Sequence, residues 1–289
     1  MSTTKQISLV TVTYNSEKTI YNLLLSIKTI DYLIKEIIVI DNNSIFFESQ
    51  KIKKISSKIK IIINKENVGF AKAVNQGIKI SKSKYILLLN PDTYLIDDSI
   101  INTYNIIIDN KKIGAIGGKI FNKKRKISYT ANTKPTFFTG LFEFTNLKKI
   151  FPNNIFTNKF WIEKNKKINK PIEVSSLCGA FLILRRKINK KLNLFNEKYF
   201  LYLEDVDFGI KINELGYKVI FDPNSHIIHI GGHSSKNKYK TDLKHWYESR
   251  EVFFKKHLKP IPSIILILIF KIEKNILYLR NLIKNDQQI

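Results

Sequence analysis

Short apolar runs alternate with stretches of helical periodicity along the first part of the chain. The apolar runs have strand length and occupy residues 7–12, 36–40, 60–63, 85–89 and 113–120. Between them, apolar residues recur at helical spacing over residues 16–27, 69–80 and 99–108, with Ser16 as the expected N-cap of the first helix. Strands this short and this apolar are typical of a parallel sheet that helices cover on both faces. The alternation predicts a Rossmann-like α/β half with a mostly parallel central sheet.

The rest of the chain divides into a weakly patterned connection, a second structured part and a helical tail. Residues 122–172 are rich in Lys, Asn, Phe and Pro, and we expect an irregular connection with surface loops there. The second part contains an apolar run at 174–184, a helix at 204–215 that ends at Gly216, and strands at 217–221 and 226–230. The expected division is one α/β domain over 1–235, with halves at 1–121 and 172–235, followed by a helical tail over 236–289.

Polar side chains follow three of the predicted strands at the point where each strand ends. The three clusters are Thr13-Tyr14-Asn15, Asp41-Asn42-Asn43-Ser44 and Asn90-Pro91-Asp92. In open α/β sheets, ligands bind outside the carboxyl ends of the strands. The clusters therefore predict a binding site at that edge of the sheet, although an isolated Asn-Pro-Asp tripeptide is also a common turn.

Two further segments carry groups suited to catalysis or metal binding. Glu204-Asp205-Val206-Asp207 opens a predicted helix, where the macrodipole favours acids whatever their function. A carboxylate in that place stays ionised, as a general base must. A lone strand histidine is usually structural, but His229 precedes Gly231-Gly232 and lies, by strand alternation, on the same face as His233. Together with Asp92, His229 would complete a site for Mn²⁺ or Mg²⁺, and the imidazole favours Mn²⁺.

Composition narrows the classes of function. The chain has 289 residues, of which 44% are hydrophobic and 25% charged, an ordinary globular mixture. Its one cysteine, Cys178, excludes an intramolecular disulfide, and the start MSTTKQ lacks a secretory signal pattern, so we expect a cytoplasmic protein. The formal net charge of +25 indicates an anionic partner, unless the abundant lysines are only solvated surface. Since the lysines are spread along the chain and no nucleic-acid module is recognised, nucleic acid is not the expected partner.

Seven short segments occur in a fixed order along residues 7–235. They are Val12–Ser16, Ile38–Ser44, Asn67–Ala71 with Asn75 and Gly77, Leu87–Asp92, Cys178–Phe181, Phe195–Glu197 leading to Tyr202–Asp207, and His229–Ser234. In this order they resemble family 2 glycosyltransferases of the GT-A fold, and within them the bacterial rhamnosyltransferase-like group. The resemblance implies a nucleotide-sugar-binding half, an acceptor-side half and a divalent metal cofactor.

The resemblance also implies a role for each matching residue. The nucleoside pocket would be formed by Thr13, Tyr14, Asn15 and Asp41, and the segment beside the nucleotide and sugar by Asn67, Gly69 and Asn75. The metal motif would be formed by Asn90 and Asp92, with His229 as its later ligand. The catalytic base would be Asp205, and the acceptor side would include Gly179, Glu204 and Asp207. Asn90 replaces the first acid of the family's Asp-X-Asp motif, and an amide binds metal less strongly than a carboxylate. Metal dependence is therefore less firmly implied than sugar transfer.

The implied reaction is a single displacement that inverts the anomeric carbon, with Asp205 taking the proton of an acceptor hydroxyl. The donor would be a nucleotide-diphosphate sugar; the resemblance favours dTDP-rhamnose and leaves UDP- and GDP-sugars open. The acceptor would be a glycan or a lipid-linked sugar of cell-surface polysaccharide synthesis. A catalytically silent nucleotide- or glycan-binding relative is expected to lack Asp205 or Asp92, and a nucleotidyltransferase would show a glycine-rich basic loop after the first strand.

The tail carries an apolar run at 261–270, bounded by Lys259 and Lys271. The run is too short for a spanning helix, which needs about 20 apolar residues. Beyond it, Ile and Leu alternate with basic residues, as in an amphipathic helix that lies in a membrane interface. The alternative is a helix packed on the protein's own core or on a partner subunit. Together with the net charge, the pattern predicts peripheral association with an anionic surface, the inner face of the cell membrane.

Overall fold

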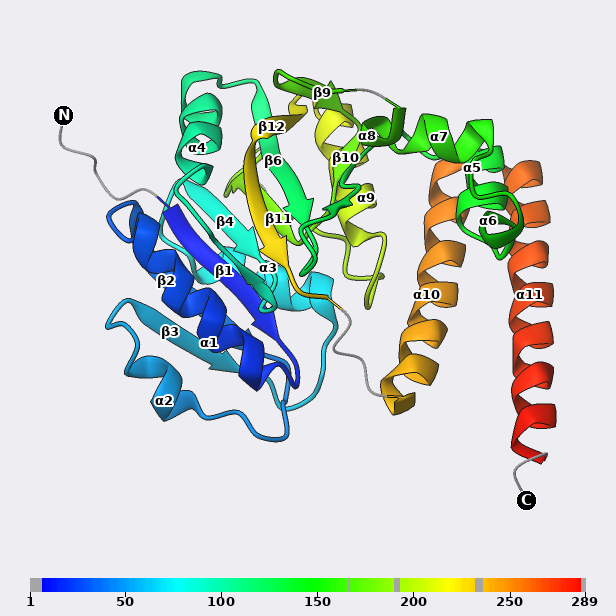
Figure 1. The fold of residues 1–289 in the computed structure, drawn as a ribbon, viewed down its shortest axis with the longest axis horizontal. Coiled ribbons are helices and arrows are strands. Elements are labelled where there is room, and N and C mark those ends of the chain that lie inside the picture. Colours follow the sequence, from blue (N-terminus) through cyan, green and yellow to red (C-terminus); the bar gives the residue numbers. More distant parts are fainter. Residues whose placement is uncertain (1–6, 166, 190–192, 232–235, 287–289) are drawn as a thin grey trace.

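A ten-stranded mixed sheet forms the centre of the computed structural model, which describes residues 7–165, 167–189, 193–231 and 236–286 (Figure 1). The strands are β1 (Ile7–Thr13), β2 (Ile34–Asp41), β3 (Ile59–Ile63), β4 (Tyr85–Leu89), β5 (Thr93–Tyr94), β6 (Ile113–Phe121), β7 (Ile127–Ser128), β8 (Ala131–Asn132), β9 (Ile172–Val174), β10 (Ser176–Leu177), β11 (Phe181–Arg185) and β12 (Lys218–His229). The order across the sheet is β3-β2-β1-β4-β11-β6-β12-β5, with β7 beside β6 and β9 beside β12. Strands β8 and β10 form a separate two-stranded sheet.

Helices cover the sheet and extend beyond one side of it (Figure 1). They are α1 (Glu17–Ser26), the 3₁₀ helix η1 (Ile27–Ile30), α2 (Ser49–Lys53), α3 (Phe70–Ile80), α4 (Ile100–Asp109), α5 (Phe137–Glu143), α6 (Leu147–Ile150), α7 (Ile155–Phe160), α8 (Ile162–Asn165), α9 (Glu204–Glu214), α10 (Lys236–His257) and α11 (Pro260–Asp286). Among the described helices, none combines the length and the apolarity that crossing a bilayer requires.

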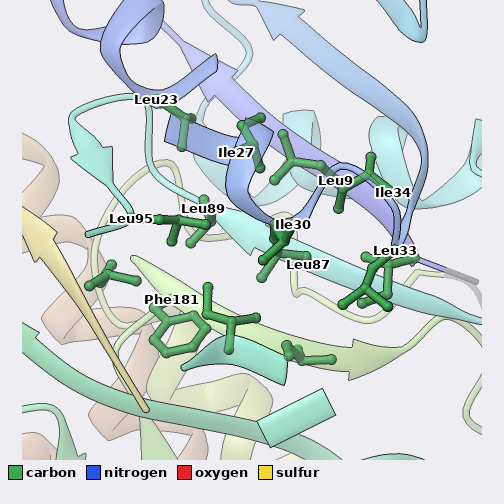
Figure 2. Close-up of a cluster of buried hydrophobic side chains, with 14 of the residues drawn as sticks. Leu9, Leu23, Ile27, Ile30, Leu33, Ile34, Leu87, Leu89, Leu95 and Phe181 are labelled. Atoms are coloured by element: carbon green, nitrogen blue, oxygen red, sulfur yellow. The ribbon is translucent and has the colours of Figure 1, made fainter. Parts of the chain in front are cut away.

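Both faces of the central sheet are buried because successive residues of a strand point to opposite sides. In β1, Leu9 belongs to the core on the α1 and α4 side, whereas Val10 belongs to the core on the α3 and α9 side. Figure 2 shows part of the first of these cores, where Ile27 and Ile30 of η1 lie beside Leu9 and Leu87 of the sheet. Burial on both faces explains the near-continuous apolar runs, and the predicted α/β sheet is confirmed.

Strand direction decides which loops meet at the edge of the sheet. β1, β2, β3 and β4 are parallel, so their carboxyl ends lie together. β11 runs antiparallel between β4 and β6, and its first residue, Phe181, lies opposite Leu89, the last residue of β4. β12 is parallel to β6 and ends with His229 beside Thr93 of β5. The starts of β11 and β5 and the ends of β4 and β12 therefore share one edge.

The connection at 122–172 is more regular than its weak periodicity indicates, and the expectation of an irregular segment is wrong. It contains β7, β8 and the four short helices α5 to α8. Two of these helices have their own side-chain caps: Thr136 accepts a hydrogen bond from the Thr139 N–H, and Asn154 accepts one from the Thr157 N–H. A helix of four to seven residues completes too few turns to show a periodic pattern.

The tail consists of two helices, α10 and α11, which lie side by side (Figure 1). Together with α5, α7 and α9 they enclose a third, largely aromatic core. Its buried members are Phe144, Phe160, Tyr199, Leu203, Val206, Ile210, Tyr247, Phe253, Phe254, Leu266 and Phe270. One face of α11 thus packs on the protein's own core, as the alternative interpretation of the tail predicted.

Three local expectations have mixed outcomes. The strands expected at 217–221 and 226–230 form the single strand β12, whose pairing with β6 shifts register between Asp222 and His226. Ser16 precedes α1, but its hydroxyl donates to the Tyr14 carbonyl instead of capping the helix. Gly216 follows α9 with φ +80°, the left-handed conformation predicted for that position.

Close packing of α9 on β10 generates a prediction for Gly209. A Cβ atom at this position would lie 2.4 Å from the Ser176 Cβ and 2.5 Å from the Ser175 carbonyl oxygen. Alanine in a helix interior normally adds about 0.5–1 kcal/mol over glycine, but overpacking of this kind costs about 1–3 kcal/mol. We expect Gly209→Ala to lower the free energy of unfolding, measured by denaturant titration. An unchanged or higher stability would contradict the packing.

Candidate active site

The loops after β1 and β2 form one wall at the carboxyl edge of the sheet. Thr13 and Asp41 pair directly in the sheet register, and both side chains are buried. The Asp41 carboxylate accepts a hydrogen bond from the Ser44 N–H at 3.1 Å. Asn15, which has φ +50°, donates its N–H to the Ser44 hydroxyl at 2.8 Å and accepts from the Ile45 N–H at 2.9 Å. These bonds cross-link the two loops.

Tyr14, in the same wall, has an exposed side chain, whereas Thr13 and Asp41 are buried. The wall therefore presents a buried carboxylate and hydroxyl beside an accessible aromatic ring. That combination suits a nucleoside, whose base has a flat face and polar edges.

Gly69 joins this wall to the segment before the acidic helix. Its φ of +84° favours glycine, and a Cβ atom there would lie 2.7 Å from the Phe200 carbonyl oxygen. The Asn67 side chain accepts the Gly69 N–H at 3.0 Å, and the Asn42 amide donates to the Gly69 carbonyl at 3.2 Å. The next N–H, of Phe70, donates to the Phe200 carbonyl at 2.7 Å. Close backbone approach thus fixes the start of α3 against the 195–203 segment.

Asn75 has a different environment from the one its implied role requires. Its amide donates to the Phe195 carbonyl at 2.8 Å and to Glu197 at 2.9 Å, and its carbonyl accepts the Phe195 N–H at 3.1 Å. Both amide protons are used within the protein, and the side chain is buried. In this structure Asn75 holds the 195–197 turn against α3, and its place beside the nucleotide and sugar stays a prediction.

Asp92 and His229 meet at the far side of the same edge. Asp92 Oδ1 lies 3.0 Å from His229 Nε2, and the Ile230 N–H donates to the Asp92 carbonyl at 2.9 Å. Burial opposes ionisation of Asp92, but the hydrogen bond and charge of His229 outweigh it and hold the pKa of the carboxyl below its usual value. Two residues before Asp92, Asn90 Oδ1 is buried and has no hydrogen-bond partner among the described residues.

This donor set fits a divalent cation. A separation of 3.0 Å between Asp92 Oδ1 and His229 Nε2 is about the spacing of two neighbouring ligands around an octahedral ion with bonds near 2.1 Å. A carboxylate with an imidazole suits Mn²⁺, and Mg²⁺ remains compatible. Within the described part of the chain, no group of three or more His, Cys, Asp or Glu side chains could hold a metal ion.

Asp205 lies in the first turn of α9 and faces the turn that precedes β11. Its carboxylate accepts hydrogen bonds from the Gly179 N–H and the Val206 N–H, each at 2.8 Å. Burial raises the pKa of the Asp205 carboxyl, in opposition to these backbone bonds. A carboxylate with a raised pKa is a stronger base, and Asp205 is less enclosed than its neighbours in the helix.

Glu204 precedes Asp205 but has lost its contact with solvent. Burial, and then the charge of Asp205, raise the pKa of Glu204 well above its ordinary value, and Oε2 lacks a partner within the described residues. Of the two carboxyls, Glu204 has the more strongly raised pKa, so it holds a proton to higher pH than Asp205 does.

The turn at 178–181 links the Asp92–His229 pair to Asp205. Gly179 donates its N–H to Asp205, and the next carbonyl, of Ala180, accepts the Asn90 N–H at 3.2 Å. Cys178 begins this turn, between β10 and β11. Burial, and to a lesser extent the charge of Asp205, raise the pKa of its thiol to about 12, so the thiol is neutral. Asp205 and Asn90, which lies two residues before Asp92, thus bond to the same turn.

Asp207, assigned above to the acceptor side, lies elsewhere, and that assignment is corrected. Its carboxylate is fully buried and accepts from Lys256 Nζ and His257 Nε2, each at 2.6 Å, both from α10. Burial opposes ionisation, but the hydrogen bonds from His257 and Lys256 lower the pKa of Asp207. Because Asp207 lies two residues after Asp205, its side chain points to the opposite side of the helix. Asp207 anchors α9 to α10.

α10 also holds the backbone before Asp205, a contact that sequence reasoning missed. Tyr202 and Leu203 both have left-handed backbones, with φ of +74° and +66°, a strain of order 1 kcal/mol each. The Ser249 hydroxyl of α10 donates to the Leu201 carbonyl at 2.7 Å and fixes this strained segment. No local sequence signal reveals the contact, since the two residues lie 48 positions apart. Sequence reasoning also missed the bond from the Asn42 amide to the Gly69 carbonyl, because Asn42 is visible in the sequence only as one member of the polar cluster at 41–44.

The last segment of the sequence pattern is only partly described. His229 is placed by β12, and Gly231 has φ +57°. Gly232, His233 and Ser234 lie outside the described residues, so the expected shared face of His229 and His233 stays a prediction.

Comparison with known proteins identifies the family of this architecture. The family described as Glycosyl transferase family 2 matches residues 8–192. An N-acetylglucosaminyl-diphospho-decaprenol L-rhamnosyltransferase from Mycobacterium tuberculosis is 23% identical over 261 residues, 86% of this chain and 84% of the relative. The rhamnosyltransferase WbbL from Escherichia coli is 24% identical over 174 residues, 60% of this chain and 62% of the relative.

A solved structure of GalNAc-T7 with UDP, GalNAc and Mn²⁺ superposes with a TM-score of 0.59 at 17% identity. The match covers 88% of this chain and 51% of that chain, so the protein spans about half of its length. At this identity the likeness concerns the fold alone, and it confirms the expected GT-A architecture.

The contacts of Asp207 generate a prediction on stability and pH. Because its pKa is lower in the folded state, its ion pairs stabilise the fold above about pH 4, and this contribution is lost as pH falls through the folded pKa. Breaking a buried pair costs about 3–5 kcal/mol. We expect Asp207→Asn to lower the free energy of unfolding by about this amount at pH 7 and by clearly less at the lowest pH, well below 3.8, at which the protein remains folded, measured by urea titration.

The matched control is Asp98→Asn, which changes an exposed acid and should leave stability within about 0.5 kcal/mol of the parent protein. An equal loss for Asp207→Asn at both pH values would contradict the proposed charge pairing.

Proposed function

The chain belongs to glycosyl transferase family 2, and from this premise we propose that it transfers a sugar from a nucleotide-diphosphate sugar to a glycan or lipid-linked acceptor in cell-surface polysaccharide synthesis. Its relatives named as rhamnosyltransferases support sugar transfer in surface-glycan assembly. The observation that carries the proposal is the 178–181 turn, which bonds to Asp205 on one side and to Asn90 on the other. A base and a candidate diphosphate-binding pair thus lie at one edge of the sheet.

Asp205 is the proposed catalytic base. Its carboxylate takes the proton of the acceptor hydroxyl while that oxygen attacks the anomeric carbon. The bond from this carbon to the phosphate oxygen breaks on the opposite face, so the configuration inverts and the nucleoside diphosphate leaves with the electron pair. The Gly179 and Val206 N–H groups orient the carboxylate, and the raised pKa of Asp205 strengthens it as a base. One displacement needs one base, and no covalent intermediate forms.

The donor is proposed to lie along the wall formed by the loops after β1 and β2. Thr13 and Asp41 are placed for the ribose or base edge, and the exposed ring of Tyr14 for the face of the base. Asn67 and Gly69, whose backbone packs on Phe200, are proposed to border the diphosphate and sugar. The names of the relatives favour a rhamnose donor such as dTDP-rhamnose, and a UDP- or GDP-sugar is the alternative.

Asp92 and His229 are proposed to hold Mn²⁺ or Mg²⁺, with Asn90 nearby as a neutral oxygen donor. A bound ion would neutralise the charge that develops on the leaving diphosphate. GalNAc-T7, which shares the fold, is named with UDP and Mn²⁺ in its structure, which supports this choice. In the protein itself, His229 keeps the Asp92 carboxyl ionised and oriented toward the same edge as Asp205.

The decisive test of the base is Asp205→Asn, which keeps the shape of the side chain and removes its basicity. We expect transfer to fall by about a factor of 10²–10⁴, while thermal stabilisation by the donor with Mn²⁺ stays unchanged. The donor is chosen beforehand by screening dTDP-rhamnose and common UDP- and GDP-sugars for such stabilisation.

Asp92→Asn is the complementary variant and Asp98→Asn the control. Asp92→Asn should remove the Mn²⁺-dependent part of donor stabilisation, and Asp98→Asn should preserve both donor binding and transfer. Undiminished transfer by Asp205→Asn would refute the mechanism, and the absence of stabilisation by any nucleotide sugar would refute the function itself.

The outer face of α11 supports the proposed attachment to a membrane. Six aliphatic side chains on this helix are 46–73% exposed: Ile261, Ile264, Ile265, Leu268, Ile272 and Ile276. At 100° per residue they fall within an arc of about 120°, opposite the buried Leu266 and Phe270. α11 therefore has a second apolar face, which no described element of the chain covers.

Charge favours anionic lipid over a second copy of the chain as the occupant of this face. Lys271 lies at the edge of the stripe, and the exposed Lys255, Lys259 and Lys274 lie near it in the sequence. Two copies would bring like charges together, whereas the inner leaflet presents anionic headgroups that attract them. We therefore propose that α11 lies in the membrane interface and that the enzyme is peripheral on the inner face of the cell membrane.

A point variant tests this attachment without removing the residues of α11 that pack inward. An aliphatic side chain entering an apolar phase contributes about 1.5–3 kcal/mol, so Ile264→Glu with Leu268→Glu should lower binding to phosphatidylglycerol vesicles at least about tenfold in a sedimentation assay. The control is Ile63→Glu, an exposed isoleucine at the end of edge strand β3. Equal sedimentation of both variants would rule out the stripe as the membrane contact.

A further inference from the structure

A run of four basic residues, Lys123-Lys124-Arg125-Lys126, forms the turn between β6 and β7. It is the only run of four consecutive Lys or Arg residues in the sequence, and all four side chains are exposed. We call residues 123–126 the basic hairpin. No other window of four residues in the chain carries as much positive charge.

Hydrogen bonds hold the basic hairpin in one conformation. The Asn122 N–H donates to the Lys126 carbonyl at 2.9 Å, and the Arg125 N–H donates to the Asn122 carbonyl at 2.8 Å. The Asn122 side chain accepts the N–H groups of Lys124 and Lys126 at 2.9 and 3.0 Å. Arg125 has φ +56°, a left-handed conformation that is costly for a residue other than glycine. The four cations are therefore displayed on a fixed framework.

The charges of the basic hairpin are not balanced within the protein. None of its four side chains forms an ion pair among the described residues. Elsewhere an exposed lysine does find an acid, as Lys218 does with Glu173 at 2.6 Å. Four like charges on adjacent residues repel one another, so a turn that holds them together favours an anionic partner.

Strand register places the basic hairpin at the edge of the sheet that carries the candidate active site. β6 is parallel to β12, and its last residue, Phe121, pairs with Ile228, the residue before His229. His229 in turn pairs with Thr93, the residue after Asp92. Since the basic hairpin begins two residues beyond Phe121, it leaves the sheet at the same edge as the Asp92–His229 pair.

Two exposed residues beside the basic hairpin narrow the kind of anion that fits it. Ile127, in β7, is 50% exposed, and Tyr129 is 41% exposed. Tyrosine is enriched at membrane–water interfaces, where its ring is buried and its hydroxyl stays hydrated. An aliphatic side chain beside cations suits the boundary between headgroups and acyl chains. A soluble anion offers no apolar phase to Ile127, so a lipid surface fits the combination better.

We propose that the basic hairpin is a docking surface for anionic phospholipid headgroups, which turns the active-site edge of the sheet toward the membrane. Clusters of four or more Lys and Arg residues bind anionic lipid, and each cation adds to the attraction. The inference rests on the proposed location of the enzyme at the inner face of the membrane. It adds a contact that α11 does not supply, and it names the edge of the sheet that faces the lipid.

Charge removal within the turn is the first test. Lys123→Gln with Lys124→Gln removes two charges from the basic hairpin, and Lys111→Gln with Lys112→Gln removes two exposed charges just before β6, at its opposite end. In sedimentation with phosphatidylglycerol vesicles at low salt, the hairpin variant should bind at least about tenfold more weakly than the parent protein. The control variant, which has the same net charge, should bind within about twofold of the parent protein.

Salt and lipid charge provide the second readout, because the proposed attraction is electrostatic. At about 0.5 M salt the difference between the hairpin variant and the parent protein should shrink, since exposed charges are then screened. With phosphatidylcholine vesicles the two proteins should bind equally. A loss of binding caused by misfolding would instead persist under both conditions.

A polarity-sensitive fluorophore tests the contact directly. It is attached to Lys124→Cys in the basic hairpin or to Lys112→Cys at the opposite end of β6, and the parent protein, whose one cysteine is Cys178, gives the background. Phosphatidylglycerol vesicles should shift the emission of the probe at position 124 to shorter wavelength. The probe at position 112 should keep its emission in water.

The outcomes separate this inference from the proposals beside it. Equal vesicle binding by the two double variants, or an unshifted probe at position 124, would show that the basic hairpin is only a solvated turn, while the α11 attachment would stand. Thermal stabilisation by inorganic diphosphate, or a gel shift with duplex DNA, that only the hairpin variant loses would assign the surface to another anion and overturn the lipid contact. Failure of the parent protein to bind vesicles would overturn the membrane location as well. Failure of every nucleotide sugar to stabilise the protein would overturn the proposed sugar transfer and not this contact.

Discussion

The antiparallel return of β11 between β4 and β6 is the constraint on which the active site depends. Because β11 begins where β4 ends, the 178–181 turn is carried to the carboxyl edge of the parallel strands. One backbone N–H of that turn orients Asp205, and the next carbonyl accepts the Asn90 N–H, so two main-chain bonds set the relation between the two chemical groups. A Cβ atom at Gly179 would lie 3.3 Å from the Asp205 Cβ, which explains why the position beside the base carries no side chain.

The sheet was predictable from the sequence because both of its faces are buried. The short helices at 137–165 were not predicted, because their sequences show no periodicity. β1 and β4 are apolar at successive positions because each contributes to two cores, so their runs and the clusters at their ends were readily found. The direction of each strand was harder to predict, because nothing in the local sequence of Phe181–Arg185 indicates that β11 is antiparallel. The 137–165 helices are too short for a repeating pattern, and their aromatic residues are matched by partners in α10 and α11. Such long-range matching leaves no trace within a local window.

Candidate site residues were predictable where the side chain lies at the end of a strand. They were not predictable where the side chain bonds to an element that is distant in the sequence. Asp92 and His229 follow strands that the sheet brings together, and the structure places them 3.0 Å apart. Asn75 was assigned to a ligand because of its place in a motif, but its amide is bonded to Phe195 and Glu197, about 120 residues away. Ser249 had been counted with the tail, yet its hydroxyl supports the strained backbone before the base. The helical tail is in this respect part of the catalytic framework.

The three acids of Glu204-Asp205-Val206-Asp207 show how environment divides roles that sequence cannot separate. All three gain from the helix N-terminus, and from their order alone each is a candidate base. Glu204 is buried and lies beside the charge of Asp205, so its pKa rises well above the ordinary value. Asp207 is buried with Lys256 and His257, so its pKa falls and its charge is consumed in holding α10. Asp205 alone combines partial exposure, a raised pKa and orientation by backbone N–H groups. Glu204 holds its proton to higher pH than Asp205, and the ion pairs of Asp207 hold α9 against α10. Of the three acids, Asp205 is therefore the carboxylate best suited to the proposed role of accepting a proton from an incoming hydroxyl.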